Sequence, residues 1–167
     1  RIDIRDAEAT QTAMTQAQPD VVIHLAAQPL VRASYEDPKE TFSTNVMGTM
    51  NVLDAVTGTN SVKASLIITT DKVYKNVNQL AGYREDDPLG GDDPYSASKA
   101  MADILTQSWV KSFDSPPTAI ARAGNVIGGG DISRDRLIPD LISAFESEVS
   151  ALIRYPGAVR PWQYVLD

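Results

Sequence analysis

Leu66-Ile67-Ile68-Thr69-Thr70 is an apolar run that ends in two threonines and is followed at once by Asp71 and Lys72. The pattern predicts a buried strand that turns polar at its end. In open α/β folds, binding and chemistry take place at the carboxyl ends of the strands. We therefore expect Thr70, Asp71 and Lys72 to lie at the reactive edge of a parallel sheet.

Strands and helices alternate on both sides of this run. We expect strands at residues 21–25, 65–70, 118–122 and 151–154, and helices at about residues 6–18, 38–56, 95–113 and 136–146. Residues 21–25 are apolar without interruption, which is typical of parallel strands covered on both faces. The alternation predicts βαβ units, and thus an α/β fold with a parallel sheet.

A tyrosine and a lysine stand four residues apart in the motif Tyr95-Ser96-Ala97-Ser98-Lys99. On a helix, this spacing puts both side chains on one face. An ammonium group beside a phenol favours the phenolate, so Tyr95 could act as a base well below the ordinary tyrosine pKa of about 10. The motif alone is weak, but a strand-end Thr70 that can hydrogen-bond a sugar hydroxyl strengthens it.

Composition excludes several other classes of protein. The chain has 167 residues and a net charge of −7, which argues against nucleic-acid binding. No apolar run approaches the roughly 20 residues of a membrane span, so we expect no membrane partner. Cysteine is absent, which excludes disulfides and fits a cytoplasmic protein. We interpret His24, the only histidine, as a buried strand residue and predict no metal site.

Arginine is the only cation after Lys111: it occurs at positions 122, 134, 136, 154 and 160. Because a guanidinium grips phosphate through a planar fork, this distribution suggests a diphosphate-bearing ligand. Chance surface arginines would explain the same distribution.

Several stretches resemble the extended short-chain dehydrogenase/reductase family, and within it the nucleotide-sugar 4,6-dehydratases. They are His24-Leu-Ala-Ala-Gln-Pro-Leu-Val-Arg32, Thr69-Thr-Asp-Lys72, Asp93-Pro-Tyr-Ser-Ala-Ser-Lys99, Ala121-Arg-Ala-Gly-Asn-Val-Ile-Gly-Gly-Gly-Asp131 and Arg160-Pro-Trp-Gln163, among others. The resemblance covers nearly the whole chain and is closest to the CDP-glucose 4,6-dehydratases.

The resemblance implies a partial Rossmann-like, doubly wound sheet. Residues 1–126 would be part of an NAD-binding domain, and residues 127–167 the start of a small substrate-binding lobe interleaved with it. No glycine-rich pyrophosphate turn opens the chain, which begins with Arg1. We therefore expect an internal piece of a longer protein, whose first strands precede Arg1.

The resemblance also implies roles for individual residues. Catalysis would rest on Thr70, Asp71, Lys72, Tyr95 and Lys99. Cofactor contacts would come from Asp3, Ile4, Leu25, Ala26, Ala27, Asn45, Thr69, Tyr95, Lys99 and Arg122. Substrate contacts would come from Gln28, Thr70, Asn125, Arg136 and Arg160.

The implied reaction converts CDP-glucose to CDP-4-keto-6-deoxyglucose by transient NAD reduction and loss of water. Asp71 is the natural acid for expelling a hydroxyl if burial keeps it protonated, although Asp also commonly caps a turn. Lys72 stands where dTDP-glucose dehydratases have a Glu. It could remove the C5 proton only when neutral, and the alternative is an ordinary surface lysine.

Two other functions remain open on the sequence. A nucleotide-sugar 4-epimerase needs Tyr95 and Lys99, but epimerases usually carry small residues where this chain has Asp71 and Lys72. A non-catalytic dinucleotide-binding relative would typically lose the tyrosine or the lysine, and both are present.

The helices at 38–57 and 94–113 carry apolar residues beyond a single stripe. These residues are Met47, Met50, Met101, Ile104, Leu105 and Trp109. A second apolar face needs a partner, so we expect a homodimer through a two-fold four-helix bundle.

Overall fold

The computed structural model describes residues 1–166. The chain divides into two compact units, Arg1–Arg122 and Ala123–Asp167, which we call unit 1 and unit 2. The division falls shortly before the boundary predicted at residue 127. The assignment of the second part to a substrate-binding lobe stays a prediction.

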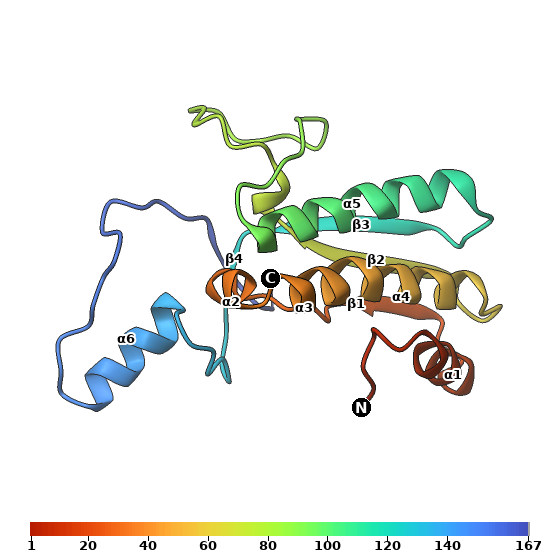
Figure 1. Ribbon diagram of the computed structural model, residues 1–167, viewed down its shortest axis with the longest axis horizontal. Helices are drawn as coiled ribbons and strands as arrows, with labels where there is room; N and C mark the ends of the chain where they lie inside the picture. Colours follow the sequence, from red (N-terminus) through yellow and green to blue (C-terminus); the bar gives the residue numbers. More distant parts are fainter. Residues whose placement is uncertain (167) are drawn as a thin grey trace. The chain divides into compact units, whose positions relative to one another are not determined.

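Unit 1 contains a three-stranded sheet in the order β1-β2-β3 (Figure 1). Its strands are β1 (Val21–His24), β2 (Ala64–Thr70) and β3 (Thr118–Ala123). β1 and β2 are parallel, with Val21 opposite Ala64 and His24 opposite Ile67. The predicted strands at 21–25, 65–70 and 118–122 are confirmed. The parallel register brings the residues after His24 close to the carboxyl end of β2.

The helices of unit 1 are α1 (Ala7–Ala17), α2 (Val31–Glu36), α3 (Pro38–Phe42), α4 (Gly48–Thr57) and α5 (Pro94–Ser112). Asp6 and Asp93 cap α1 and α5 by accepting backbone N–H bonds, which explains where these two helices begin. The helix predicted at 38–56 is present, but a π-helical turn at Ser43–Met47 joins α3 to α4. The short helix α2 was not predicted.

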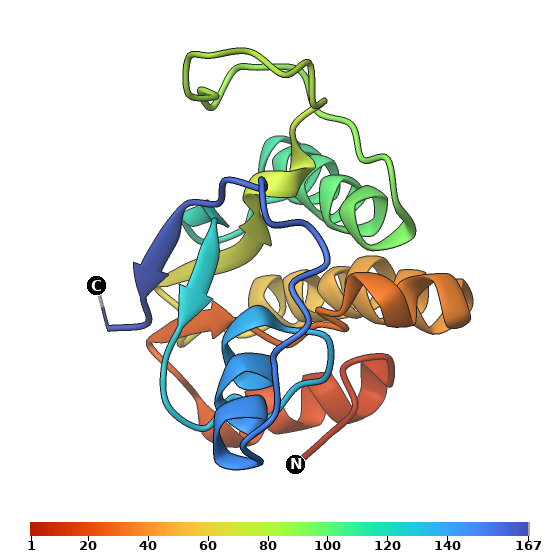
Figure 2. The same cartoon turned by 90° about the vertical axis from the view of Figure 1, so that its left-hand side faces the viewer.

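Helices α4 and α5 pack on one face of the sheet (Figure 2). The apolar core cluster contains Val52 and Val56 of α4 together with Val62. Ile4, Met14 and Val22 pack against these three residues. Alternate residues of β1 point to the other face, where Val21 and Ile23 are each 56% exposed.

Unit 2 contains β4 (Asn125–Ile127), α6 (Leu137–Glu146) and β5 (Trp162–Tyr164). β4 and β5 pair in parallel. Helix α6 is confirmed, but the strand predicted at 151–154 is wrong. A strand needs a pairing partner, and β4 pairs with β5 instead, while Arg154 binds Asp135 and Asp140. Within residues 1–166, none of the helices combines the length and the apolar character needed to cross a membrane.

Candidate active site

The first two turns of α5 carry the predicted catalytic pair. Asp93 accepts the N–H of Ser96, so the helix starts just before Tyr95 and places Lys99 one turn further on the same face. Lys99 is buried, and its Nζ donates to the carbonyl oxygen of Ile68 at 2.7 Å. Burial lowers the pKa of Lys99 to about 8. The lysine is therefore anchored to β2 and closer to neutrality than an exposed one.

Thr70, Asp71 and Lys72 lie at the carboxyl end of β2, as predicted. The hydroxyl of Thr70 donates to Oδ1 of Asp71 at 3.0 Å. The Nζ atom of Lys72 lies 5.9 Å from the centre of the Tyr95 ring. Thr70 is buried, whereas the side chain of Lys72 is exposed. The structure thus brings together all five predicted catalytic residues, from β2, the turn after it and α5.

Two buried serines hold the backbone of Tyr95. Its N–H donates to Oγ of Ser34, on α2, at 3.1 Å, and its carbonyl accepts from Oγ of Ser98 at 2.7 Å. Both serines are fully buried. Ser98 lies inside the motif that the sequence singled out, but Ser34 is 61 residues away from Tyr95 and no local pattern marks it.

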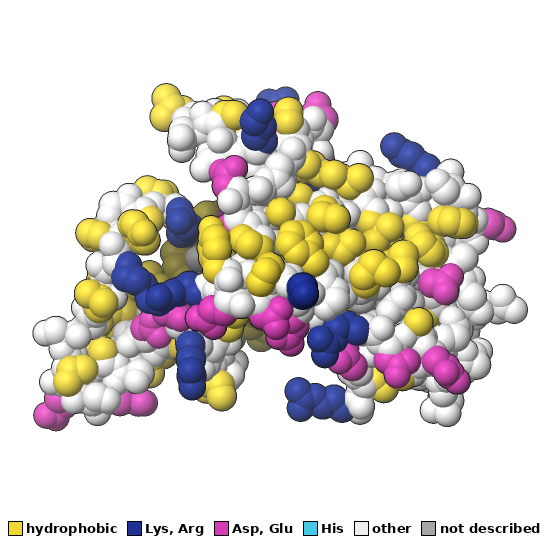
Figure 3. Space-filling model, viewed as in Figure 1, with side chains coloured by type: hydrophobic (Ala, Val, Ile, Leu, Met, Phe, Trp, Pro, Cys, Tyr) yellow, Lys and Arg dark blue, Asp and Glu magenta, His cyan; other side chains and the backbone are white. Residues whose placement is uncertain are grey.

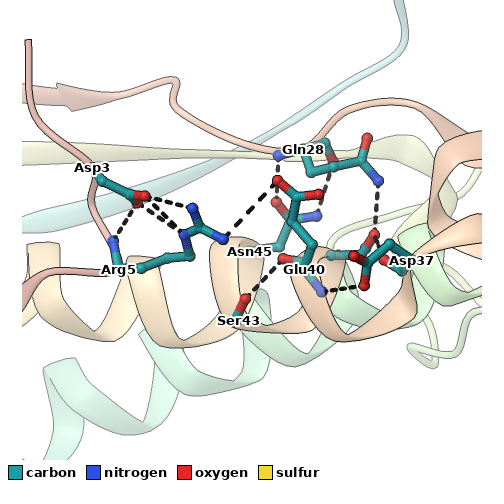
Figure 4. Close-up of polar contacts among 8 residues, drawn as sticks. Asp3, Arg5, Gln28, Asp37, Glu40, Ser43 and Asn45 are labelled. Carbon is teal, nitrogen blue, oxygen red and sulfur yellow. Dashed lines mark hydrogen bonds and ion pairs between the residues drawn. The ribbon is translucent and has the colours of Figure 1, made fainter.

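Asn45 connects the loop after β1 to α5. Figure 4 shows its bonds to Gln28 in that loop. Its side chain accepts the N–H of Gln28 at 2.8 Å, and donates to the Gln28 carbonyl at 3.0 Å and to Oγ of Ser98 at 2.9 Å. The residue lies in the π-helical turn, a feature often found at functional sites. The Gln28 side chain donates to Thr41 at 2.8 Å, so it braces its own loop, and its contact with substrate stays a prediction.

His24 is buried and hydrogen-bonded, as predicted. Its Nε2 lies 3.1 Å from Oγ1 of Thr49, which itself donates to the carbonyl of Asn45. Because the Thr49 hydrogen is used in that second bond, we assign the hydrogen of the first bond to Nε2 of a neutral imidazole. Burial, and then the nearby charge of Lys99, lower the pKa of His24 to about 4.

Asp3 and Ile4, the residues predicted near adenine, lie at the start of the chain. The carboxylate of Asp3 accepts bonds from the backbone and side chain of Arg5 (Figure 4), and these bonds lower its pKa to about 2. Ile4 packs tightly on Gly48, where a Cβ atom would come within 2.6 Å of the Ile4 side chain. Contacts of either residue with a cofactor stay predictions.

Arg122 and Thr69, two further predicted cofactor residues, both bond to the buried carboxylate of Asp103. Arg122 also donates to the hydroxyl of Tyr74 and to the carbonyl of Glu85. Four of its hydrogen bonds are thus made within the protein. Asp103 lies four residues after Lys99, so the helical period alone could have pointed to it.

The remaining predicted substrate residues belong to unit 2. Asn125 starts β4, and its N–H donates to the carbonyl of Pro161. Arg136 lies 3.5 Å from Asp131, and Arg160 donates to the carbonyl of the residue before it. These contacts are internal to unit 2, so the predicted substrate roles stay predictions.

The sequence matches one family model over residues 1–167, that of the NAD dependent epimerase/dehydratase family. The chain belongs to this family. CDP-glucose 4,6-dehydratase of Salmonella typhimurium is 48% identical over 173 residues, which cover 99% of this chain and 48% of that protein. dTDP-glucose 4,6-dehydratase 1 of Escherichia coli is 32% identical over 183 residues, which cover 99% of this chain and 50% of that protein.

Solved structures agree with the sequence comparison. A double mutant of the Streptomyces venezuelae dTDP-glucose 4,6-dehydratase, solved with NAD bound, superposes with a TM-score of 0.86 at 26% identity. The match covers 98% of this chain and 49% of that enzyme, so the chain spans about half the length of these relatives. The predicted family and the partial Rossmann-like α/β fold are confirmed.

The family is NAD-dependent, and the residues present fit that cofactor. Leu25 and Ala26 are exposed where β1 ends, and with Ala27 they offer small or apolar side chains beside the end of β2. Lys99 reaches the same edge, and the carbonyl of Ile68 uses one of the three N–H donors of its ammonium group. These residues would hold part of the cofactor.

Proposed function

We propose that the protein containing this chain is an NAD-dependent nucleotide-sugar 4,6-dehydratase, with CDP-glucose as its substrate. The observation that carries the proposal is the position of Lys72 against the ring of Tyr95. This position supports a role for Lys72 and its neighbour Asp71 as an acid–base pair beside the tyrosine that would start the reaction. An epimerase needs the tyrosine and has no use for the pair.

In this proposal, Tyr95 accepts the proton of the sugar 4-hydroxyl, and Lys99 stabilises the phenolate. When bound, NAD would supply hydride acceptance from C4 and hydride return to C6. The C4 ketone acidifies the C5 proton, which a base at Lys72 removes while Asp71 protonates the departing 6-hydroxyl. Lys72 then gives its proton back to C5 as the hydride returns to C6. Thr70, hydrogen-bonded to Asp71, orients that carboxyl group and the sugar.

The side chain of Lys72 is exposed in this structure. A lysine acts as a base only when neutral, which requires desolvation or a neighbouring cation. Substrate bound over Tyr95 would supply the first of these. We therefore expect Lys72→Met to block water loss and solvent-deuterium exchange at C5, yet allow NADH formation. Lys72→Glu supplies a carboxylate base at the same position, so this variant should still release water from the substrate.

Asp71→Asn tests the acid. The substitution keeps the shape of the side chain but removes the carboxylic proton, so C4 oxidation should continue while water loss slows. NADH absorbance should then accumulate after substrate is added. An equal fall in both steps would show that Asp71 only positions the substrate.

The nucleotide is tested by offering CDP-, dTDP-, UDP- and GDP-linked glucose to the intact protein and measuring the mass of the product. The 48% identity to a CDP-glucose enzyme supports turnover of the CDP sugar, with loss of one water. An unchanged mass with altered stereochemistry would indicate an epimerase. A cytoplasmic location stays part of the proposal.

A homodimer is also part of this proposal. Hydrophobic side chains gather over α4 and α5 in the space-filling view (Figure 3). Met101 and Ile104 of α5 are 48% and 54% exposed, and Met47, which directly precedes α4, is 48% exposed. A two-fold bundle of these helices would bury them. Light scattering on the intact protein tests the proposal, and a monomer at working concentration would contradict it.

A further inference from the structure

Arg122 lies at the centre of a partly buried polar network that the proposed chemistry does not use. Its Nε and Nη2 atoms donate to the two carboxylate oxygens of Asp103 at 2.8 Å and 3.0 Å, a bidentate pair. Its Nη1 atom donates to the hydroxyl of Tyr74 at 3.0 Å and to the carbonyl of Glu85 at 2.9 Å. The guanidinium carbon also lies 4.8 Å from the centre of the Tyr74 ring.

The Asp103 side of the network is buried and held by several hydrogen bonds. The side chain of Asp103 is fully buried, and it also accepts from Thr69 at 3.2 Å and from Gln107 at 2.7 Å. Burial alone would raise the pKa of Asp103, but the bonds from Arg122 and Gln107 outweigh it and lower the pKa. The carboxylate therefore stays charged and ties α5 to β2 and β3, one turn beyond Lys99.

On its other side, the network reaches Tyr74, which follows the turn that carries the proposed acid, Asp71, and the proposed base, Lys72. Tyr74 directly follows the 3₁₀ turn Asp71–Val73, and its N–H donates to the carbonyl of Asp71. Beyond Tyr74, the chain returns alongside, and the N–H of Gly90 donates to the carbonyl of Val73 at 2.7 Å. The ring of Tyr74 thus fixes this turn to Arg122.

We infer that the Arg122–Asp103 pair acts through Tyr74 as a positioning device for the elimination step, holding Asp71 and Lys72 in register with Tyr95. This inference rests on the proposed dehydratase function. Tyr95 and Lys99 are held by other bonds, from Ser34, Ser98 and the carbonyl of Ile68. Loosening the Tyr74 end should therefore disturb water loss and leave the first hydride transfer intact.

The test is Tyr74→Phe in the intact protein. The substitution removes the hydroxyl that accepts from Arg122 but keeps the ring. Tyr83→Phe is the matched control, because the two rings stack with centroids 5.0 Å apart, while the Tyr83 hydroxyl contacts Val77 and Asn76 instead. Each variant is first compared with wild type in thermal unfolding, and then NADH formation and water loss are timed separately in single turnovers.

We expect Tyr74→Phe to slow water loss by about 10- to 100-fold, as a misplaced catalytic group does, with NADH forming at the wild-type rate and then accumulating. Tyr83→Phe should match wild type in both steps. If Tyr74→Phe slows both steps equally, or changes neither, the inference is overturned. A wild-type protein that oxidises the sugar but never releases water would overturn the proposed function, and the inference with it.

Discussion

Unit 1 and unit 2 use their polar side chains in opposite ways. In unit 1, buried hydroxyl, amide and carboxylate groups bind one another around Tyr95, and Ser34, Ser98 and Asp103 are fully buried. In unit 2, no residue of α6 is buried, and Phe145 and Leu152 are 70% and 81% exposed. A side chain can be held in one geometry only where neighbours surround it, so the geometry of the proposed catalytic residues is built in unit 1.

The ion pairs of the two units show the same contrast. Asp103 and Arg122 form a bidentate pair whose side chains are 0% and 12% exposed. Arg154 of unit 2 binds Asp135 and Asp140, and all three side chains are more than a third exposed. Solvent screens the second group and not the first, so removing one partner should have very different consequences.

The largest effect is expected for Tyr95→Phe in unit 1. Removing the base should lower turnover by about 10²- to 10⁴-fold while leaving NAD binding largely intact. Steady-state turnover and fluorescence titration with NAD measure the two quantities. Tyr155→Phe is the matched control in unit 2, where Tyr155 is 81% exposed, and it should leave turnover unchanged. Wild-type turnover in the Tyr95 variant would remove Tyr95 from the mechanism.

Asp103→Ala should be the most destabilising of the ion-pair substitutions. It leaves the nearly buried guanidinium of Arg122 without its carboxylate, which typically costs about 3–5 kcal/mol. Denaturant unfolding of the intact protein measures this change. A loss below about 1 kcal/mol, the range of exposed pairs, would show that unit 1 is no better packed here than unit 2.

Acid should destabilise unit 1 through His24. Its pKa is 6.5 in the unfolded chain and about 4 in the folded one, so only the unfolded state takes up a proton between these values. His24 therefore leaves the free energy of unfolding unchanged above pH 6.5. As the pH falls from 6.5 toward 4, it lowers this free energy by up to roughly 3 kcal/mol. His24→Gln should flatten the dependence of unfolding free energy on pH in this window. An unchanged slope would show that His24 is not held neutral.

The smallest effect is expected for Asp140→Ala in unit 2. It removes one carboxylate from the exposed group around Arg154, which should cost about 0–1 kcal/mol. The same denaturant measurement applies. A cost close to that of Asp103→Ala would mean that unit 2 is buried in the intact protein, and the contrast between the units would then belong to this chain alone.

Local patterns predicted most of the secondary structure in advance. The apolar runs at 21–25 and 65–70 became β1 and β2, and the helices expected at about 6–18 and 95–113 became α1 and α5. In unit 1 the short helix α2 was not predicted, and in unit 2 β4 was not predicted and the strand expected at 151–154 is absent. Strands this short depend on which partner pairs with them, and pairing is not a local property.

The sequence by itself determined most elements of unit 1 and the residue types that carry the proposed chemistry, because both follow from spacing along the chain. Tyr95 and Lys99 share a helix face by period, and Thr70 to Lys72 end a strand by pattern. Only the tertiary structure decided that Ser34 supports Tyr95 and that Tyr74 is tied to Arg122. These partners are 61 and 48 residues apart, and contacts at such separations arise only when the helices and strands pack.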